Sequence, residues 1–236
     1  MKKIIIVGGG FAGINAARDL GNVPGVQVTL IDRRNHHLFQ PLLYQVAMSG
    51  LSPADIATPI RSILSEFKNV TVIMAKAEKI DAKNSSLETS VGTFEYDELI
   101  LACGARHTYF GNNHWEKFAP GLKTVTQATE IRRRVLTAFE RAEAARDDEE
   151  RAKHLHFVVV GGGPTGVELA GAIGEMARYT LKDDFRNIDL KSTKVTLLEA
   201  GPGILPMFDQ SQALKAKAGL EQLGVEVRTG AMVTNV

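Results

Sequence analysis

Two glycine clusters carry the strongest chemical signal in the sequence. The first is Gly8-x-Gly10-x-x-Gly13 and the second is Gly161-x-Gly163-x-x-Gly166. In such a motif the first glycine permits a tight turn, the second lets the backbone approach a pyrophosphate, and the third lets a helix pack closely on a strand. The N–H groups that begin the next helix then offer partial positive charge to the phosphates. Each cluster therefore predicts a dinucleotide-binding turn.

A carboxylate follows each glycine cluster. Asp32 comes after the first cluster at close to the interval of roughly 20 residues that is typical of an acid on a ribose hydroxyl. Glu199 comes later after the second cluster, and the polar segment 180–194 predicts a loop insertion that explains the delay. No arginine follows Glu199 to receive a 2′-phosphate, which the carboxylate would repel. The second site is therefore predicted to prefer NADH over NADPH.

The elements that must position these residues occur twice in the same order. Each cluster is preceded by a short, apolar, β-branched strand and followed by a helix, and a second buried strand then ends at the acid. The predicted segments are 4–7, 10–20 and 26–31 in the first copy, and 157–160, 167–178 and 195–198 in the second. This order predicts parallel sheets with right-handed crossovers and a duplication of one dinucleotide-binding unit.

Other elements are predicted between and after the two copies. We expect a helix with Thr58 as its N-cap and Pro59 at N1, and short antiparallel strands around a turn at 83–86. A long amphipathic helix is expected over 127–146, and the acidic run 147–150 is expected to lie in a solvated loop. Further strands are predicted at 70–74, 99–102 and 225–228, and a further helix at 210–223.

Composition excludes several other classes of protein. The 236 residues have a net charge of +1, which offers no overall attraction to nucleic acid. The single cysteine, Cys103, excludes a disulfide framework, a thiolate zinc site and a dithiol redox pair, and we expect it to be a buried packing thiol. Adjacent His36 and His37 would point apart on a strand, so no metal site is predicted, and both are expected to line a loop near the cofactor. No signal peptide and no membrane span are predicted, which favours a reducing cytoplasm.

Two dinucleotide sites in one chain indicate one tightly held flavin and one exchangeable nicotinamide. The natural reaction is hydride transfer from the nicotinamide to the flavin, followed by electron transfer to an acceptor, and the cofactors supply that chemistry. The predicted fold class is α/β, with two Rossmann-like units, for FAD and NAD, on three-layer parallel sheets. The second unit is expected to be incomplete, because the strands that a doubly wound sheet normally adds do not follow before Val236, so a longer protein is expected.

The sequence resembles the flavoproteins that bind two dinucleotides, and among them the type II NADH dehydrogenases, which are non-proton-pumping NADH:quinone oxidoreductases. The most family-specific stretch is 32–47, DRRNHHLFQPLLYQVA, and segments 96–104, 160–172 and 204–209 support it. The disulfide reductases of this superfamily carry a cysteine pair where residues 39–46 lie here, and this chain has none. A thiol relay is therefore excluded, as is a sulfide-oxidising relative that needs several cysteines.

The resemblance implies domains and site residues. It implies an FAD-binding domain over 1–113, a helical connection over 114–153 and an NADH-binding domain over 154–236. Glu168 would lie toward the nicotinamide and quinone region as the catalytic candidate, the alternative being an acid in the first turn of its own helix that favours the helix dipole. The implied FAD residues are Gly8, Gly10, Phe11, Ala12, Gly13, Asp32, Arg33, Gln40, Leu42, Leu43, Ala77, Ala102 and Gly104, and the implied NADH residues are Gly161, Gly163, Pro164, Thr165, Gly166 and Glu199.

The resemblance also implies partners. The electron acceptor would be a membrane quinone, and a region beyond Val236 would attach the protein peripherally to the cytoplasmic face of the cell membrane. No nucleic acid is expected as a partner, and a homodimer is left open. Two alternatives remain at this stage: a soluble NADH-dependent reductase of a small iron–sulfur protein, and a non-catalytic redox sensor that binds dinucleotides.

Overall fold

The computed structural model describes residues 1–236, which divide by packing into two compact units. Unit 1 comprises residues 1–39 and 53–106, and unit 2 comprises residues 40–52 and 107–236. Residues 40–52 thus leave the first unit and pack within the second, inside the range predicted for a single FAD-binding domain. The assignment of 1–113, 114–153 and 154–236 to FAD binding, connection and NADH binding stays a prediction.

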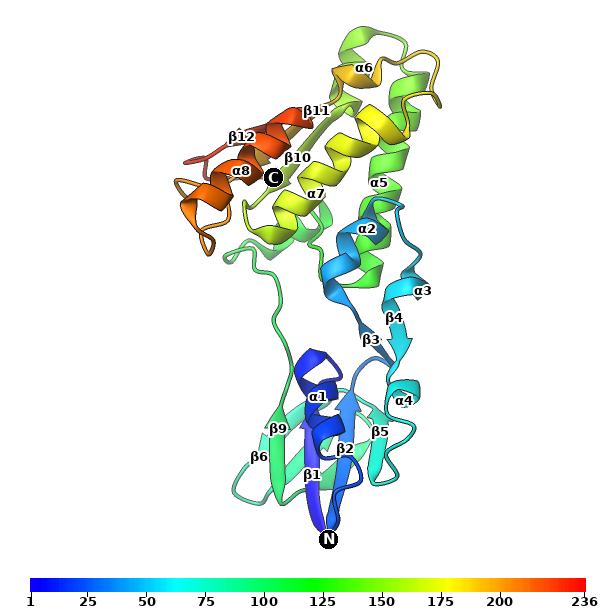
Figure 1. Cartoon of the computed structure of the whole chain (residues 1–236), viewed down its shortest axis with the longest axis vertical. Coiled ribbons are helices and arrows are strands. Elements are labelled where there is room, and N and C mark those ends of the chain that lie inside the picture. Colours follow the sequence, from blue (N-terminus) through cyan, green and yellow to red (C-terminus); the bar gives the residue numbers. More distant parts are fainter. The chain divides into compact units, whose positions relative to one another are not determined.

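Unit 1 is built on a parallel sheet with the strand order β5-β2-β1-β9 (Figure 1). The first strand lies inside the sheet and later strands are added on both sides of it, which is the doubly wound, Rossmann-like arrangement predicted above. Its strands are β1 (Lys2–Val7), β2 (Val26–Asp32), β5 (Val70–Met74) and β9 (Glu98–Leu101), close to the predicted bounds.

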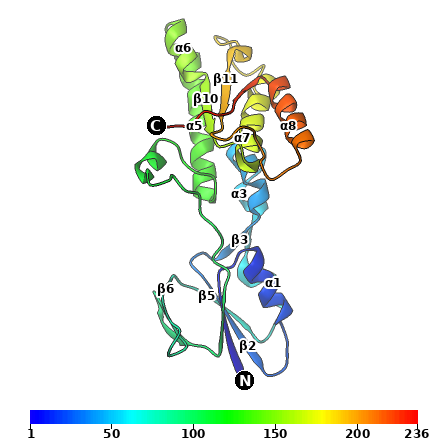
Figure 2. The same cartoon turned by 90° about the vertical axis from the view of Figure 1, so that its left-hand side faces the viewer.

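Both faces of this sheet are covered, because its strands are apolar on both sides. On one face, Ile6 and Leu30 pack against Ile14 of helix α1 (Phe11–Asp19). On the other face, Ile5 packs against Leu87 of a small antiparallel sheet. Figure 2 shows α1 and strand β6 of the small sheet on opposite sides of the parallel strands. The small sheet consists of β6 (Ala77–Asp81), β7 (Ser86–Thr89) and β8 (Gly92–Glu95), and it confirms the predicted turn at 83–86.

The predicted helix start at Thr58 is wrong. Strand β3 (His36–Leu38) pairs antiparallel with β4 (Ala57–Pro59), and this pairing places Thr58 opposite His37 in extended conformation. Pro59 is therefore the N-cap of the short helix α4 (Ile60–Ile63), which follows helix α3 (Pro53–Ile56). Thr-Pro predicts a helix start at Thr58, but pairing with β3, about 20 residues earlier in the chain, holds Thr58 in a strand.

Unit 2 contains a second parallel sheet with the order β10-β11-β12, made of β10 (His156–Val160), β11 (Lys194–Leu198) and β12 (Val225–Arg228). Helices α7 (Pro164–Glu175) and α8 (Gln210–Gln222) pack on this sheet side by side (Figure 1). A π-helical turn, η3 (Met176–Thr180), extends α7, and the predicted polar loop after it contains only the short 3₁₀ helix η4 (Leu190–Ser192). The second copy of the unit is thereby confirmed.

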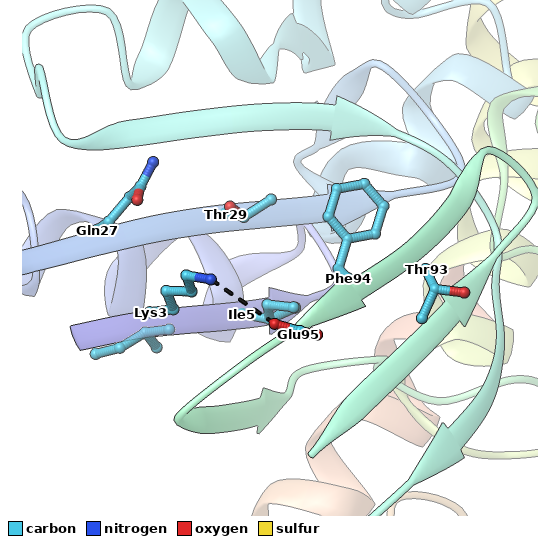
Figure 3. Close-up of a pocket in the computed structure, with 8 residues that line it drawn as sticks. Lys3, Ile5, Gln27, Thr29, Thr93, Phe94 and Glu95 are labelled. Carbon is cyan, nitrogen blue, oxygen red and sulfur yellow. Dashed lines mark ion pairs between the residues drawn. The ribbon is translucent and has the colours of Figure 1, made fainter. Parts of the chain in front are cut away.

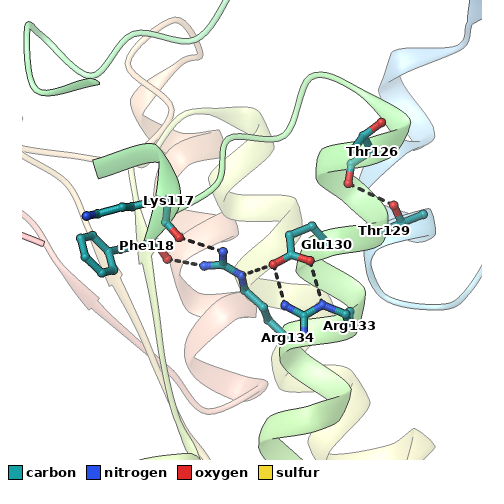
Figure 4. A network of polar contacts seen from close by, with 7 residues as sticks. All are labelled: Lys117, Phe118, Thr126, Thr129, Glu130, Arg133 and Arg134. Atoms are coloured by element: carbon teal, nitrogen blue, oxygen red, sulfur yellow. Dashed lines mark hydrogen bonds and ion pairs between the residues drawn. The ribbon is translucent and has the colours of Figure 1, made fainter. Parts of the chain in front are cut away.

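Helix α5 (Val125–Ala144) confirms the predicted amphipathic helix of unit 2. The Thr124 side chain caps its N-terminus by accepting the N–H of Gln127 at 3.1 Å. Figure 4 shows Glu130 bound by Arg133 and Arg134, whose contacts hold the pKa of the Glu130 carboxyl at about 2. Arg134 also donates to the carbonyls that end the 3₁₀ helix η2 (Asn113–Lys117), so it joins α5 to the segment before it.

The acidic run 147–150 begins a helix, where a loop had been predicted. Asp147 is the N-cap of α6 (Asp148–His154), and its side chain accepts the N–H of Glu150 at 2.8 Å. Carboxylates in the first turn are favourable because they face the positive end of the helix dipole. The same charges that suggested a solvated loop are therefore a helix start signal.

Residues 40–52 form the 3₁₀ helix η1 (Gln40–Leu42) and the helix α2 (Leu43–Ala47). Helix α2 packs against α5 and α7 within unit 2. No helix of the chain has both the length and the apolar character that crossing a membrane requires.

Candidate functional site

The two glycine clusters form the same turn at the carboxyl ends of β1 and β10. The Gly8 N–H donates to the Ile31 carbonyl at 2.8 Å, and the Gly161 N–H donates to the Leu198 carbonyl at 2.8 Å. Their φ angles are +113° and +105°, which L side chains rarely adopt. The first glycine of each motif is therefore required by the backbone, as the sequence predicted.

The third glycine of each motif is required by packing. A Cβ on Gly13 would lie 1.7 Å from the Gly8 carbonyl oxygen, and one on Gly166 would lie 1.9 Å from the Gly161 carbonyl oxygen. Both oxygens belong to backbone that the neighbouring strands hold in place. Each helix can approach its turn this closely only because the side chain is absent.

Neither the backbone conformation nor the packing of the turn requires a glycine at the middle position of either motif. Gly10 has φ −78° and ψ −168°, and Gly163 has φ −73° and ψ 176°, values open to any residue. A Cβ on either would meet nothing within 4 Å. Both are N-caps of their helices, and no side chain caps either helix. The open space and the uncapped N–H groups fit the pyrophosphate of a dinucleotide.

The two predicted acids hold these turns in the same way. The Asp32 carboxylate accepts the Gly9 N–H at 2.6 Å and the Arg34 N–H at 2.7 Å. The Glu199 carboxylate accepts the Gly162 N–H and the Gly201 N–H, both at 2.6 Å. A carboxylate offers about four acceptor positions. Each acid therefore has capacity left for the hydroxyls of a ribose while it supports the turn.

In each turn, the carbonyl of the residue between the first two motif glycines also accepts a hydrogen bond. This residue is Gly9 in unit 1 and Gly162 in unit 2. In unit 1 the Nδ1 of His37 lies 3.0 Å from the Gly9 oxygen, and in unit 2 the Leu205 N–H donates to the Gly162 oxygen at 2.7 Å. The sequence predicts that His36 and His37 line a loop, but both lie on strand β3. Neither role could be predicted from the sequence, since no local pattern indicates which distant group reaches a given carbonyl.

The other predicted residues of unit 1 are spread around its turn. Phe11 and Ala12 form the exposed start of α1, and Ala102 follows β9, where its oxygen would be 2.1 Å from a Cβ on Gly8. The remaining members are Arg33, which is exposed after Asp32, Ala77, which is half-buried at the start of β6, and Gly104, which is exposed with φ +67°. The structure thus brings Ala102 to the turn together with Asp32.

Cys103 contradicts the expectation of a buried thiol. The residue is exposed, with its Sγ 3.8 Å from the Val7 carbonyl oxygen. It lies two residues beyond the end of β9, outside the sheet.

The predicted residues of unit 2 differ in their exposure to solvent. Pro164 and Thr165 are exposed in the first turn of α7, beside Gly163. Gln40 and Leu42 are half-buried in η1, and Leu43 is buried at the start of α2. Because Gln40, Leu42 and Leu43 pack within unit 2, their place beside the flavin stays a prediction.

Glu168 lies in the second turn of α7, since the first turn of this helix contains no acid. The alternative interpretation, an acid in the first turn that favours the helix dipole, is therefore wrong. Glu168 is exposed as a residue, but partial burial of its carboxyl raises the pKa of that group above its ordinary value. The Glu168 carboxyl therefore binds a proton more readily than a fully solvated one does.

A cavity of about 430 Å³ lies between the sheet of β1 and β2 and the small sheet of unit 1 (Figure 3). It is lined by residues of the parallel strands, such as Lys3, Ile5 and Gln27, and by Phe94 and its neighbours on β8, none of which belongs to the glycine turn. The Lys3 ammonium lies 4.0 Å from the Glu95 carboxylate across its opening. Open α/β sheets bind ligands at the carboxyl ends of their strands, so this cavity is a gap in layer packing.

The fold and these turns define a class of protein with two dinucleotide-binding units in one chain. Residues 2–236 match the model of the pyridine nucleotide-disulphide oxidoreductase family. The chain belongs to this family, although it has a single cysteine.

Relatives of known name agree with this placement. The chain is 47% identical over 238 residues to the type II NADH:quinone oxidoreductase Ndh of Mycobacterium tuberculosis, covering 99% of this chain and 51% of the relative. It is 48% identical to NdhA of the same organism, covering 99% and 50%. The structure of NDH2 from Plasmodium falciparum in complex with NADH superposes with a TM-score of 0.91 at 28% identity, over 100% of this chain and 49% of that one. The chain therefore spans about half the length of the curated relatives it matches.

Proposed function

We propose that this chain is the dinucleotide-binding part of an FAD-dependent NADH:quinone oxidoreductase. One observation carries the proposal: the same turn is built twice, each time with a middle glycine that leaves space at an uncapped helix N-terminus. Two such turns imply two dinucleotides in one protein. The names of the relatives support the choice of NADH as donor and quinone as acceptor.

We assign FAD to unit 1 and NADH to unit 2. In unit 1, Asp32 would bind the FAD ribose, with the pyrophosphate at the start of α1. In unit 2, Glu199 would bind the NADH ribose. Arg228 on the adjacent strand is paired with Glu226 at 2.8 Å and 3.0 Å, so its guanidinium is not directed to a 2′-phosphate. Glu199 would repel such a phosphate, which favours NADH over NADPH.

The residues of the chain bind and orient the cofactors. When bound, the flavin and the nicotinamide supply the hydride and electron chemistry. The turns fix each pyrophosphate by backbone N–H groups, and the acids fix each ribose, so that each dinucleotide has one orientation. Holding two reactants in a defined orientation removes much of the entropic barrier to their reaction.

The test is a stopped-flow experiment on the full-length protein. Anaerobic mixing with NADH should bleach bound FAD, and a short-chain quinone should then restore the flavin absorbance within the time of steady-state turnover. Flavin that is reoxidised by a rubredoxin or ferredoxin but not by quinone would instead identify a soluble reductase. Negligible turnover with every acceptor would identify a redox sensor, and a protein that binds one nucleotide only would refute the proposal.

Partners and location belong to the same proposal. A membrane quinone as acceptor implies peripheral membrane association, which we place on the cytoplasmic face of the cell membrane through residues outside 1–236. A homodimer is compatible with this arrangement. Flotation of the full-length protein with vesicles, compared with residues 1–236 alone, tests where the membrane contact lies.

Glu168 is proposed as the catalytic residue nearest the nicotinamide and quinone region. Because burial raises its pKa, the ionised form is disfavoured in the folded protein, and its contribution to stability is lost as the pH rises through the raised pKa. Glu168→Gln should therefore leave the melting temperature at neutral pH unchanged or slightly higher. Turnover with quinone should fall about 100-fold or more, as is typical of a lost proton-transfer group. Unchanged turnover at every pH would remove Glu168 from the reaction.

A further inference from the structure

His37 holds a backbone carbonyl of the first glycine turn. Its Nδ1 lies 3.0 Å from the Gly9 oxygen, and a carbonyl oxygen only accepts hydrogen bonds. The proton must therefore be on Nδ1, which defines the neutral tautomer of the ring. The ring is also placed from two other sides, by an edge contact with Phe11 at 4.9 Å between centroids and by the pairing of β3 with β4.

This hydrogen bond determines the direction of a different group. The Gly9 oxygen and the Gly10 N–H belong to one planar, trans peptide unit, so they point in opposite directions. Fixing the oxygen fixes the N–H of Gly10, which is the N-cap of α1. The Gly9 N–H is held separately by Asp32 at 2.6 Å. The two peptide units on either side of the Gly9 Cα are thus each anchored by one side chain.

In unit 2 the corresponding carbonyl is held by a backbone N–H group and not by a side chain. The corresponding carbonyl, that of Gly162, accepts the backbone N–H of Leu205 at 2.7 Å, and Glu199 holds the Gly162 N–H. The carbonyl is therefore anchored in both copies, by a backbone donor in one and by His37 in the other. Two different donors at equivalent positions indicate that the anchored carbonyl matters to the turn.

We propose that His37 is a positioning residue for the first dinucleotide, which orients the Gly10 N–H toward the pyrophosphate. The inference rests on the proposed function, in which unit 1 binds FAD. A donor on the carbonyl also polarises the peptide unit, because hydrogen bonds in a chain strengthen one another. The Gly10 N–H is thereby both directed and made a better donor to a phosphate oxygen.

The test compares three variants of the full-length protein. His37→Phe keeps a ring against Phe11 but removes the donor, and His37→Asn removes the ring but places an amide N–H near the position of Nδ1. His36→Phe is the matched control, because the hydrogen bond of the His36 ring, at 3.2 Å, is to its exposed neighbour Asn35. The readouts are the FAD dissociation constant of the apoprotein, the NADH dissociation constant, and the melting temperature.

His37→Phe should weaken FAD binding about tenfold, the effect of one lost hydrogen bond, with NADH binding unchanged. His37→Asn should recover most of the loss, and His36→Phe should bind FAD like the wild type. Wild-type affinity in His37→Phe would overturn the inference. So would equal losses in His37→Phe and His37→Asn, since restoring the donor would then recover no affinity.

A second measurement does not depend on variants. Nitrogen NMR of the histidine rings in the wild-type protein should show His37 protonated on Nδ1 when neutral. A ring protonated on Nε2 alone would overturn the inference. A wild-type protein that binds no FAD would refute the proposed function itself, whereas FAD binding that ignores the His37 donor refutes only its positioning role.

Discussion

The two glycine turns are nearly identical in their inner contacts and differ in what surrounds them. In both turns the first glycine has a positive φ, and a Cβ on the third glycine would lie within 2 Å of a backbone carbonyl oxygen. In both, a carboxylate accepts the N–H of the residue that follows the first glycine. The outer supports differ, since His37 serves one turn and Leu205 the other. The contacts closest to a pyrophosphate are thus repeated, whereas the supports can change as long as they donate to the same carbonyl.

The sheets below the turns differ more. Ile5 and Val7 of β1 are 2% and 8% exposed, because the small antiparallel sheet covers them. Val158 and Val160 occupy the corresponding positions of β10 and are 53% and 55% exposed. Apolar, β-branched residues suit a strand that is buried on both faces. A strand can therefore have the composition of a buried strand even where one of its faces is exposed.

The largest effect is expected when the third glycines are replaced. Gly13→Ala and Gly166→Ala each place a Cβ within 2 Å of a backbone oxygen, which cannot move without its strand. Each should destabilise its own unit by at least about 3 kcal/mol, above the usual cost of overpacking. Urea denaturation with a probe in each unit measures this. A mild effect in one copy only would show that the two turns are not equivalent.

The next largest effect is a difference in stability loss between equivalent substitutions in the two parallel sheets. Ile5→Ala removes a buried side chain between layers and should cost about 2 to 4 kcal/mol. Val158→Ala changes an exposed residue and should cost under about 0.5 kcal/mol in residues 1–236. Denaturation of the two variants beside the wild type gives both values. Similar costs at the two sites would mean that the open face of β10 is covered in solution.

Replacing the middle glycines should affect ligands and leave the fold intact. Gly10→Ala and Gly163→Ala meet nothing within 4 Å and keep allowed backbone angles, so melting temperatures of the apoproteins should stay within a few degrees. FAD affinity should fall about 100-fold in Gly10→Ala alone, because displacement of the pyrophosphate by about 1 Å is costly. In Gly163→Ala the NADH KM should rise while FAD stays bound. The reverse pattern would exchange the two cofactor assignments.

The smallest of these effects is expected from amide substitutions of the acids. Asp32→Asn and Glu199→Gln replace one carboxylate oxygen by an NH₂ group, which cannot accept a backbone N–H. Each should weaken its own dinucleotide by roughly tenfold, through a looser turn and a lost ribose contact. Isothermal titration with FAD and NADH on both variants measures the effects. A loss of both ligands in one variant would contradict independent turns.

Much of this molecule could be predicted from local patterns. The apolar strands, the glycine spacing and the terminal acids were identified because each depends on residues close in sequence, and the structure places them at the carboxyl ends of two parallel sheets. The long helix over 125–144 was found for the same reason, since its apolar residues recur at helical spacing. Errors arose where a local signal had two meanings, as with the acidic run that begins α6 and the Thr-Pro pair that ends β4.

The sequence by itself determined that two dinucleotide-binding turns exist and which glycines and acids form them, because steric and electrostatic demands at a turn are local. Only the tertiary structure decided that residues 40–52 pack with unit 2, that Cys103 is exposed, and that His37 reaches the carbonyl of Gly9. Those facts depend on which distant segments meet. The sequence does not indicate which donor will bind a given backbone carbonyl, so this part of the site could be identified only from the tertiary structure.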